Sequence, residues 1–138
     1  MSVRSTQQAA FTAERTYDAS PARVFAAFAM REAKSRWFGG PDDREDEQLD
    51  FRVGGREFYN SRVPRGPVYS MKALYHDIVP DQRILSTYEM YMDEARISVS
   101  VLTVELHAAG AGTQLILTEQ GVFLDGHDKP EYREKRDE

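Results

Sequence analysis

The feature that most constrains the fold is a change in hydrophobic period near residue 49. Before this point, apolar residues recur every three or four positions. After it, they alternate with polar residues, and short turns separate the alternating runs. Alternation with a period of two is typical of strands that bury one face. Because short turns join antiparallel neighbours, most of the chain is predicted to form one antiparallel sheet.

Turn residues divide the chain into about six to seven strands. Within the segment 97–106, the apolar positions change parity between Val101 and Leu102, which predicts a β-bulge there. The strands are expected at residues 11–17, 49–53, 58–63, 68–79, 84–92, 97–106 and 115–120.

Two short helices are expected before the sheet. Ser20 suits a helix N-cap and Pro21 suits the first helical position. Helical spacing resumes between Met30 and Trp37 and ends at a Gly-Gly-Pro sequence. The segment 42–48 holds five acidic residues and is expected to be a solvated loop. Residues 1–8 are expected to be a loose polar lead-in.

Composition excludes several classes of protein. With 138 residues, the chain is expected to form a single domain, 1–138. It has no cysteine, which excludes disulfides and thiolate sites and fits a reducing, cytoplasmic environment. The net charge of −5 argues against nucleic acid as a partner. No apolar run approaches the roughly 18 residues of a membrane span, so no membrane partner is expected.

No metal or cofactor is expected. His76, His107 and His127 lie far apart in sequence and lack the spacing of metal ligands. The sequence has no nucleophile elbow of a Ser hydrolase and no dinucleotide fingerprint. The glycines of the segment 110–112 fit a hairpin turn better than a phosphate loop.

Four segments carry a resemblance to a known family, and they are Ser20 to Phe25 with Trp37-Phe38, Val53 to Glu57, Asp77 to Ile84, and Gly112 to Gly126. In these segments the sequence resembles proteins similar to the activator of heat-shock protein 90 ATPase, and the resemblance covers about residues 9–135. The resemblance implies membership of the START-like (SRPBCC) superfamily and a helix-grip α+β fold with a curved antiparallel sheet, two short helices and a C-terminal helix. It is strongest to a bacterial subgroup of undefined function.

The C-terminal helix is expected to be truncated or absent in this sequence. Family members of this kind continue with a Leu-rich helix, whereas here residues 130–138 are all that could begin it. An apolar sheet face needs a cover, because soluble monomers rarely expose a large apolar patch. We therefore expect either that the protein continues beyond Glu138 or that a second copy, in a homodimer, covers the face.

Strand parity and the resemblance together predict a ligand cavity. Glu119 shares the parity of Leu115 and Leu117, which places its carboxylate on the apolar face. There the carboxylate could act as an acid, a base or a ligand contact. Alternatively, it could pair with an arginine or lie at the open entrance of the cavity. Each aromatic residue could equally belong to an ordinary core. The predicted ligand-binding residues are Trp37, Phe58, Tyr69, Met71, Tyr75, Tyr88, Met90 and Glu119.

The resemblance leaves three functions open. The first is non-enzymatic binding of a small apolar or aromatic molecule, with no catalytic residue. The second is an enzyme on the same scaffold, cyclase- or aromatase-like or hydrolytic, which would need a mutually bonded cluster among Glu119, His76 and Tyr88. The third is a module that binds a chaperone partner, although fold alone does not transfer function.

Overall fold

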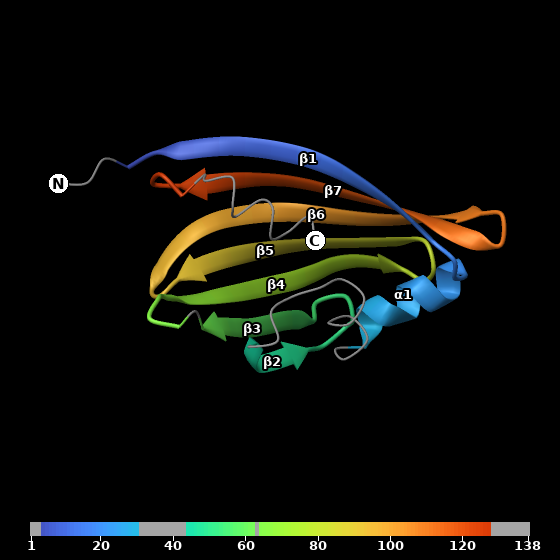
Figure 1. Cartoon of the computed structure of the whole chain (residues 1–138), viewed down its shortest axis with the longest axis horizontal. Helices are drawn as coiled ribbons and strands as arrows, with labels where there is room; N and C mark the ends of the chain where they lie inside the picture. The colour runs from blue at the N-terminus through green and yellow to red at the C-terminus, as the bar shows by residue number, and fades with distance from the viewer. Residues whose placement is uncertain (1–3, 31–43, 63, 128–138) are drawn as a thin grey trace.

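The computed structural model describes residues 4–30, 44–62 and 64–127. Within these ranges, seven strands form one antiparallel sheet, and one helix lies against it (Figure 1). The elements in chain order are β1 (Thr6–Tyr17), α1 (Pro21–Ala29), β2 (Arg44–Leu49), β3 (Arg56–Arg62), β4 (Val68–Val79), β5 (Arg83–Met92), β6 (Ala95–Ala109) and β7 (Gly112–Leu124).

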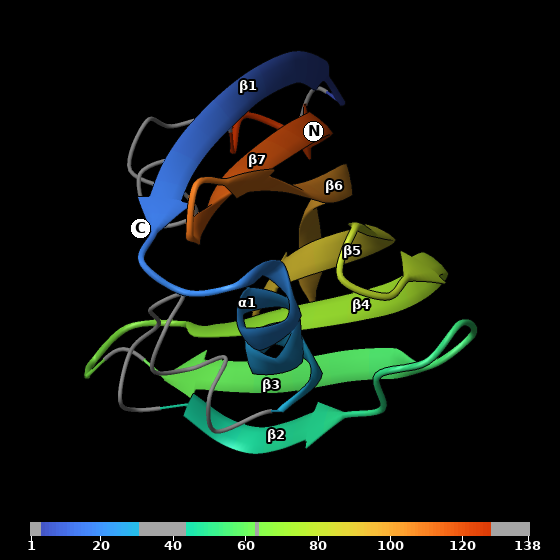
Figure 2. The same ribbon diagram turned by 90° about the vertical axis from the view of Figure 1, so that its right-hand side faces the viewer.

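The strand order in the sheet is β1-β7-β6-β5-β4-β3-β2. Strands β2 to β7 are therefore neighbours in chain order, whereas β1 lies beside β7 at the far edge. Every pair is antiparallel. The sheet curves strongly around α1 (Figure 2). The predicted curved antiparallel sheet is confirmed.

The sequence around α1 explains where the helix begins. The Ser20 hydroxyl accepts a hydrogen bond from the backbone N–H of Arg23 at 3.3 Å, and Pro21 occupies the first turn, as predicted. The buried Thr113 hydroxyl on β7 donates to the carbonyl oxygen of Ala19 at 2.7 Å. This bond fixes the start of the helix to the last strand.

Burial alternates along each central strand, as expected for a sheet with one buried face. We call the side on which α1 packs the α1 face and the opposite side the outer face. The α1 face is mostly buried, whereas the outer face is mostly half-buried or exposed. Residues on the α1 face of β4 to β7 include Met71, Ala73, Tyr75, Ile84, Ser86, Tyr88, Ser98, Ser100, Val104, Leu106, Leu115, Glu119 and Phe123.

The end of the α1 face nearest the helix is a dry hydrophobic core. It joins apolar side chains of the helix to those of the four central strands β4 to β7, and it gives α1 the tertiary packing that a nine-residue helix needs to be stable. This core consists of Val24, Phe28, Tyr75, Ile84, Val104, Leu106 and Leu115.

Several predicted boundaries differ from the structure. β1 begins at Thr6, so residues 6–8 belong to the strand and not to a loose lead-in. β2 occupies most of the acidic segment 42–48, for which a solvated loop is predicted. Charged residues are tolerated there because β2 is an edge strand. The predicted second helix over 31–37 and the C-terminal helix over 130–138 lie outside the described residues.

The strand predicted over residues 49–53 ends at Leu49, and the chain then turns back as a loop. Gly54 adopts a φ of 84°, a conformation that suits glycine. Its N–H donates to the carbonyl oxygen of Tyr75 at 2.8 Å, and the N–H of Tyr75 donates to the carbonyl oxygen of Gly55 at 3.0 Å. The loop is therefore bonded to the backbone of β4.

Phe51 explains why the loop segment looked like a strand. Its ring contacts the rings of Phe25 and Tyr75 edge-on, at centroid distances of 5.6 and 5.1 Å. The apolar side chain of Phe51 therefore packs the loop against the core, whereas the side chain of Val53 is exposed.

The β-bulge predicted at Val101–Leu102 is wrong. The pairing of β6 with β5 and with β7 is continuous through both residues. The register with β5 shifts instead between Met90 and Tyr91, which leaves Ile97 on β6 as the extra residue.

The side chains of β6 show why its parity was misread. Val99 and Val101 lie on the outer face and are 38% and 43% exposed, whereas Ser98 and Ser100 lie buried on the α1 face. The sequence pattern indicates that these valines face inward, because apolar side chains usually face the core. On this strand, the inward positions are polar.

We predict that Thr113→Val lowers the free energy of unfolding by about 1–3 kcal/mol, because it keeps the side-chain shape but leaves the half-buried Ala19 carbonyl without its hydroxyl donor. Thr118→Val, on the outer face of the same strand, is the control and should change stability by less than about 0.5 kcal/mol. Urea unfolding of both variants measures the difference. Equal effects would contradict the role given to Thr113.

Candidate functional site

The half of the α1 face farther from the helix has a different composition from the dry core. Its buried apolar residues are Met71, Ala73 and Tyr88, and Tyr59, Met90 and Leu102 pack against them. Methionine and tyrosine side chains adapt to ligands of varied shape more readily than a branched aliphatic core does.

Three polar side chains meet in this half, one from each of three adjacent strands. Tyr88 on β5 pairs with Ser100 on β6, and Glu119 on β7 pairs with Leu102, two residues along β6 from Ser100. The Tyr88 hydroxyl donates a hydrogen bond to Oε1 of Glu119. Tyr88, Ser100 and Glu119 are 8%, 2% and 4% exposed. We call these three residues the polar cluster.

Ser100 is the unusual member of the polar cluster. Its buried Oγ has no hydrogen-bond partner among the described residues. Burying a hydroxyl without a partner costs free energy, so such groups are rare in folded proteins. Gly121 lies opposite Ser100 on β7, and a Cβ at that position would be 2.6 Å from the Ser100 Oγ. The glycine therefore accommodates the hydroxyl without bonding to it.

A second tyrosine–glutamate pair lies on the same face. The Tyr75 hydroxyl donates to Oε1 of Glu57 at 2.6 Å, and both side chains are buried. Burial, followed by the adjacent Glu57 carboxylate and its hydrogen bond, raises the pKa of Tyr75 above its ordinary value. Tyr75 therefore stays protonated and remains a donor at neutral pH.

Two glutamates are buried on the α1 face. Among the described residues, the buried charged side chains are Glu57 and Glu119, and none of the buried residues is Lys or Arg. The described part of the chain also holds no group of three His, Cys, Asp or Glu side chains that could bind a metal ion.

Six of the eight predicted ligand-binding residues lie on the α1 face, as strand parity predicts. They are Tyr69, Met71, Tyr75, Tyr88, Met90 and Glu119. Trp37 lies outside the described residues.

Phe58 does not share this face. It pairs with Lys72 on the outer face, where Asn60 accepts a hydrogen bond from Ser70 at 2.6 Å. Its neighbour Tyr59 takes the inward position instead. A one-residue error in parity moves a side chain to the opposite face of a strand.

The three residues proposed for an enzymatic cluster are only partly together. Tyr88 and Glu119 are hydrogen-bonded, whereas His76 is exposed and lies 2.8 Å from the Thr87 hydroxyl on the outer face. His76 sits at a register shift between Tyr75 and Asp77, so its position could not be read from alternation.

Sequence reasoning missed several polar residues of the α1 face. Ser100 and its neighbour Ser98 were overlooked because adjacent valines were taken as the inward residues. Counting back in steps of two from Val104 would have placed both serines inward. The missed inward residues are Glu57, Tyr59, Ser61, Ser98 and Ser100.

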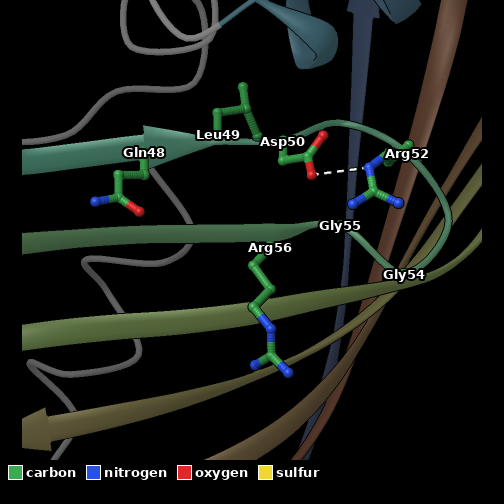
Figure 3. A pocket seen from close by; sticks show the side chains of 7 residues that line it. All are labelled: Gln48, Leu49, Asp50, Arg52, Gly54, Gly55 and Arg56. Atoms are coloured by element: carbon green, nitrogen blue, oxygen red, sulfur yellow. Dashed lines mark hydrogen bonds and ion pairs between the residues drawn. The ribbon is translucent and has the colours of Figure 1, made fainter.

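An open hollow of about 310 Å³ lies at the loop after β2 (Figure 3). Its ion pair joins Arg52 to Asp50 at 2.8 Å, and both side chains are largely exposed. Arg56 points away from this pair (Figure 3). The hollow contains no buried polar group that would orient a ligand, so the polar cluster is the better candidate. The lining residues are Gln48, Leu49, Asp50, Arg52, Gly54, Gly55 and Arg56.

We predict that Ser100→Ala raises the free energy of unfolding by about 1 kcal/mol, because it removes a buried hydroxyl that lacks a partner. Ser98→Ala is the matched control on the same face of β6. Because Ser98 has an interaction partner, its replacement should destabilise the protein by about 1 kcal/mol. Opposite signs in urea unfolding are the expected result, and a loss of stability in both variants would contradict it.

We also predict that Gly121→Ala destabilises the protein by about 1–3 kcal/mol, because the new methyl group would overlap the Ser100 Oγ. The double variant Gly121→Ala with Ser100→Ala should recover most of this loss. A double-mutant cycle by thermal unfolding measures the coupling. Simple additivity would show that the two positions do not compete for space.

Comparison with known proteins agrees with the fold. The family described as "Activator of Hsp90 ATPase homolog 1-like protein" matches residues 18–135. A search of curated proteins found no match. No helix among the described residues is long and apolar enough to cross a membrane.

Solved bacterial structures are similar over nearly the whole chain. The Mll3558 protein of Rhizobium loti is 44% identical with a TM-score of 0.86, and the match covers 95% of this chain and 90% of that one. An uncharacterised protein of Rhizobium leguminosarum is 40% identical with a TM-score of 0.90, covering 98% and 90%. CV1439 of Chromobacterium violaceum, at 21% identity and a TM-score of 0.69 over 92% and 88%, shares the fold. The chain belongs to the family of Activator of Hsp90 ATPase homolog 1-like proteins, with the helix-grip fold of the START-like superfamily.

Proposed function

We propose that the protein binds a small apolar or aromatic molecule on the α1 face, at the half farther from the helix, without catalysing a reaction. The observation that carries the proposal is the buried polar cluster within a face of methionine and tyrosine. Ligand sites usually combine an adaptable apolar lining with a few fixed polar groups.

The composition of this half supports binding over a purely structural role. A core that served only stability would gain from apolar side chains in place of a partnerless hydroxyl. Here Ser100, Tyr88 and Glu119 occupy inward positions on three adjacent strands. Polar groups held on strands are well placed to orient a ligand, because rigid elements fix their positions.

The hydrogen bond between Tyr88 and Glu119 also favours an enzyme as a second candidate, since bonded acid and donor groups can transfer protons. Two observations weigh against an enzyme. His76 faces the opposite side of the sheet. The Ser100 hydroxyl has no base bonded to it among the described residues, and a serine nucleophile needs one.

The neutral fluorescent probe N-phenyl-1-naphthylamine tests the location of the site. We predict saturable binding to the native protein, and a roughly tenfold loss of affinity in Tyr59→Ala, because this change removes aromatic contact area from the α1 face. Tyr91→Ala is the matched control, since Tyr91 is a half-buried tyrosine on the outer face, under the Lys72 ammonium.

Circular dichroism should first show that both variants are folded. Equal loss of affinity in the two variants would place binding elsewhere, and the absence of saturable fluorescence in the native protein would contradict the proposed function itself.

A further inference from the structure

We infer that the protein forms a dimer in which β1 pairs antiparallel with β1 of a second copy. β1 is the last strand at one end of the sheet, and no described element lies beyond it (Figure 1). A strand in this position presents unpaired N–H and C=O groups, with which another chain can pair. In this arrangement the second copy extends the sheet and does not cover the α1 face.

The pairing of β1 with β7 fixes which backbone groups point away from the sheet. The N–H of Asp125 donates to the carbonyl oxygen of Ser5 at 2.9 Å, and the register continues from there along all of β1. Because bonded and non-bonded pairs alternate between antiparallel strands, odd-numbered residues of β1 bond to β7 and even-numbered residues direct their N–H and C=O groups away from it. These outward residues, which we call the open edge, are Thr6, Gln8, Ala10, Thr12, Glu14 and Thr16.

Two side chains of β1 bond to carbonyl groups of the open edge. The Gln7 amide donates to the carbonyl oxygen of Gln8 at 3.4 Å, and the Arg15 guanidinium donates to that of Glu14 at 3.1 Å. Both carbonyls belong to the even-numbered set, as the register requires. A carbonyl oxygen has two lone pairs, so neither contact prevents pairing with a second strand.

The two edges of the sheet differ in their protection against such pairing. β2, at the other edge, has six residues, of which four are charged, and its register shifts between Glu45 and Gln48. Short length, charged residues and bulges are the usual features that keep edge strands from pairing. β1 instead has twelve residues in unbroken register, and its charged residues are Glu14 and Arg15, near one end. β1 therefore has the length and regularity of a strand that is paired on both sides.

The sequence of β1 is complementary to itself about Phe11, which favours a second copy over an unrelated extended peptide. With Phe11 on the two-fold axis, Gln8 of one copy faces Glu14 of the other, and no like charges lie opposite each other. Only this register pairs all six residues of the open edge. The half-buried Phe11 rings of the two copies then lie side by side on the α1 face, and aromatic cross-strand pairs of this kind stabilise a sheet.

Single cysteine variants test the position of the axis, because the native chain has no cysteine. Facing residues of a non-hydrogen-bonded antiparallel pair have Cα atoms about 4.5 Å apart, which suits a disulfide. Phe11→Cys should therefore cross-link under oxidised glutathione at least about tenfold faster than the matched control Ala9→Cys on the same face. The two copies of residue 9 are about 13 Å apart, because each faces Ala13 of the other copy. Equal rates of cross-linking in the two variants would overturn the inference.

Charge variants test the register by sedimentation equilibrium. The native protein should show a reversible monomer–dimer equilibrium between about 10 μM and 1 mM, as expected for a small interface. Gln8→Lys should tighten the dimer at least about threefold, because it places an ammonium opposite the Glu14 carboxylate, and Gln8→Glu should weaken the dimer by a similar factor. Gln82→Glu, in the turn between β4 and β5, is the matched control and should leave the dissociation constant unchanged.

The remaining outcomes are equally decisive. A native protein that stays monomeric up to about 1 mM is evidence against the β1 dimer, and its open edge is then available to a different partner. A dimer with the same dissociation constant in Gln8→Lys and Gln8→Glu forms through another surface, which also contradicts the inference. If circular dichroism shows that Phe11→Cys does not fold, the opposite effects of the two charge variants decide, since Gln8 is exposed.

Discussion

The α1 face has to be buried along strands that are much longer than the helix that packs on it. A helix of nine residues spans about 14 Å, whereas the 15 residues of β6 extend for about 50 Å. Near α1, aliphatic and aromatic residues pack into a hydrophobic core. Farther along the same strands, the inward positions become methionine, tyrosine, serine and glutamate. The sheet thus divides into one half that stabilises the fold and another suited to a ligand.

The bounds of β4 followed from the sequence, whereas β6 and β7 are longer than the predicted ranges 97–106 and 115–120. β4 has the predicted bounds, and Asp81 in the turn after it has a φ of 64°, a conformation that Asp tolerates in turns. The strand predicted over residues 49–53 is wrong beyond its first residue. Phe51 lies in a loop, and its apolar ring packs against the ring of Tyr75. Alternation cannot distinguish a loop residue that packs on the core from a strand residue that faces it.

The residues of the site could be predicted from the sequence where alternation along a single strand showed which side chains face inward. Glu119 and Tyr88 were placed inward by counting along single strands, and both lie there. Their hydrogen bond was not predictable, because it joins residues 31 positions apart and depends on the register of two strand pairs. Ser100 was missed because the outward valines of β6 carry the stronger apolar signal. The inward position predicted for Phe58 is wrong, because the neighbouring aromatic residue Tyr59 faces inward instead.

Buried polar residues of the α1 face do not all have the same meaning. Glu57 accepts the Tyr75 hydroxyl, and Ser98 has a partner, so their hydrogen bonds offset part of the cost of burial. The Ser100 hydroxyl, equally buried, obtains no such compensation among the described residues. We expect a serine in that position to lower stability relative to alanine, because the alanine side chain has no polar atom that needs a hydrogen bond. The position is therefore better explained by an interaction made when the protein works than by the stability of the chain alone.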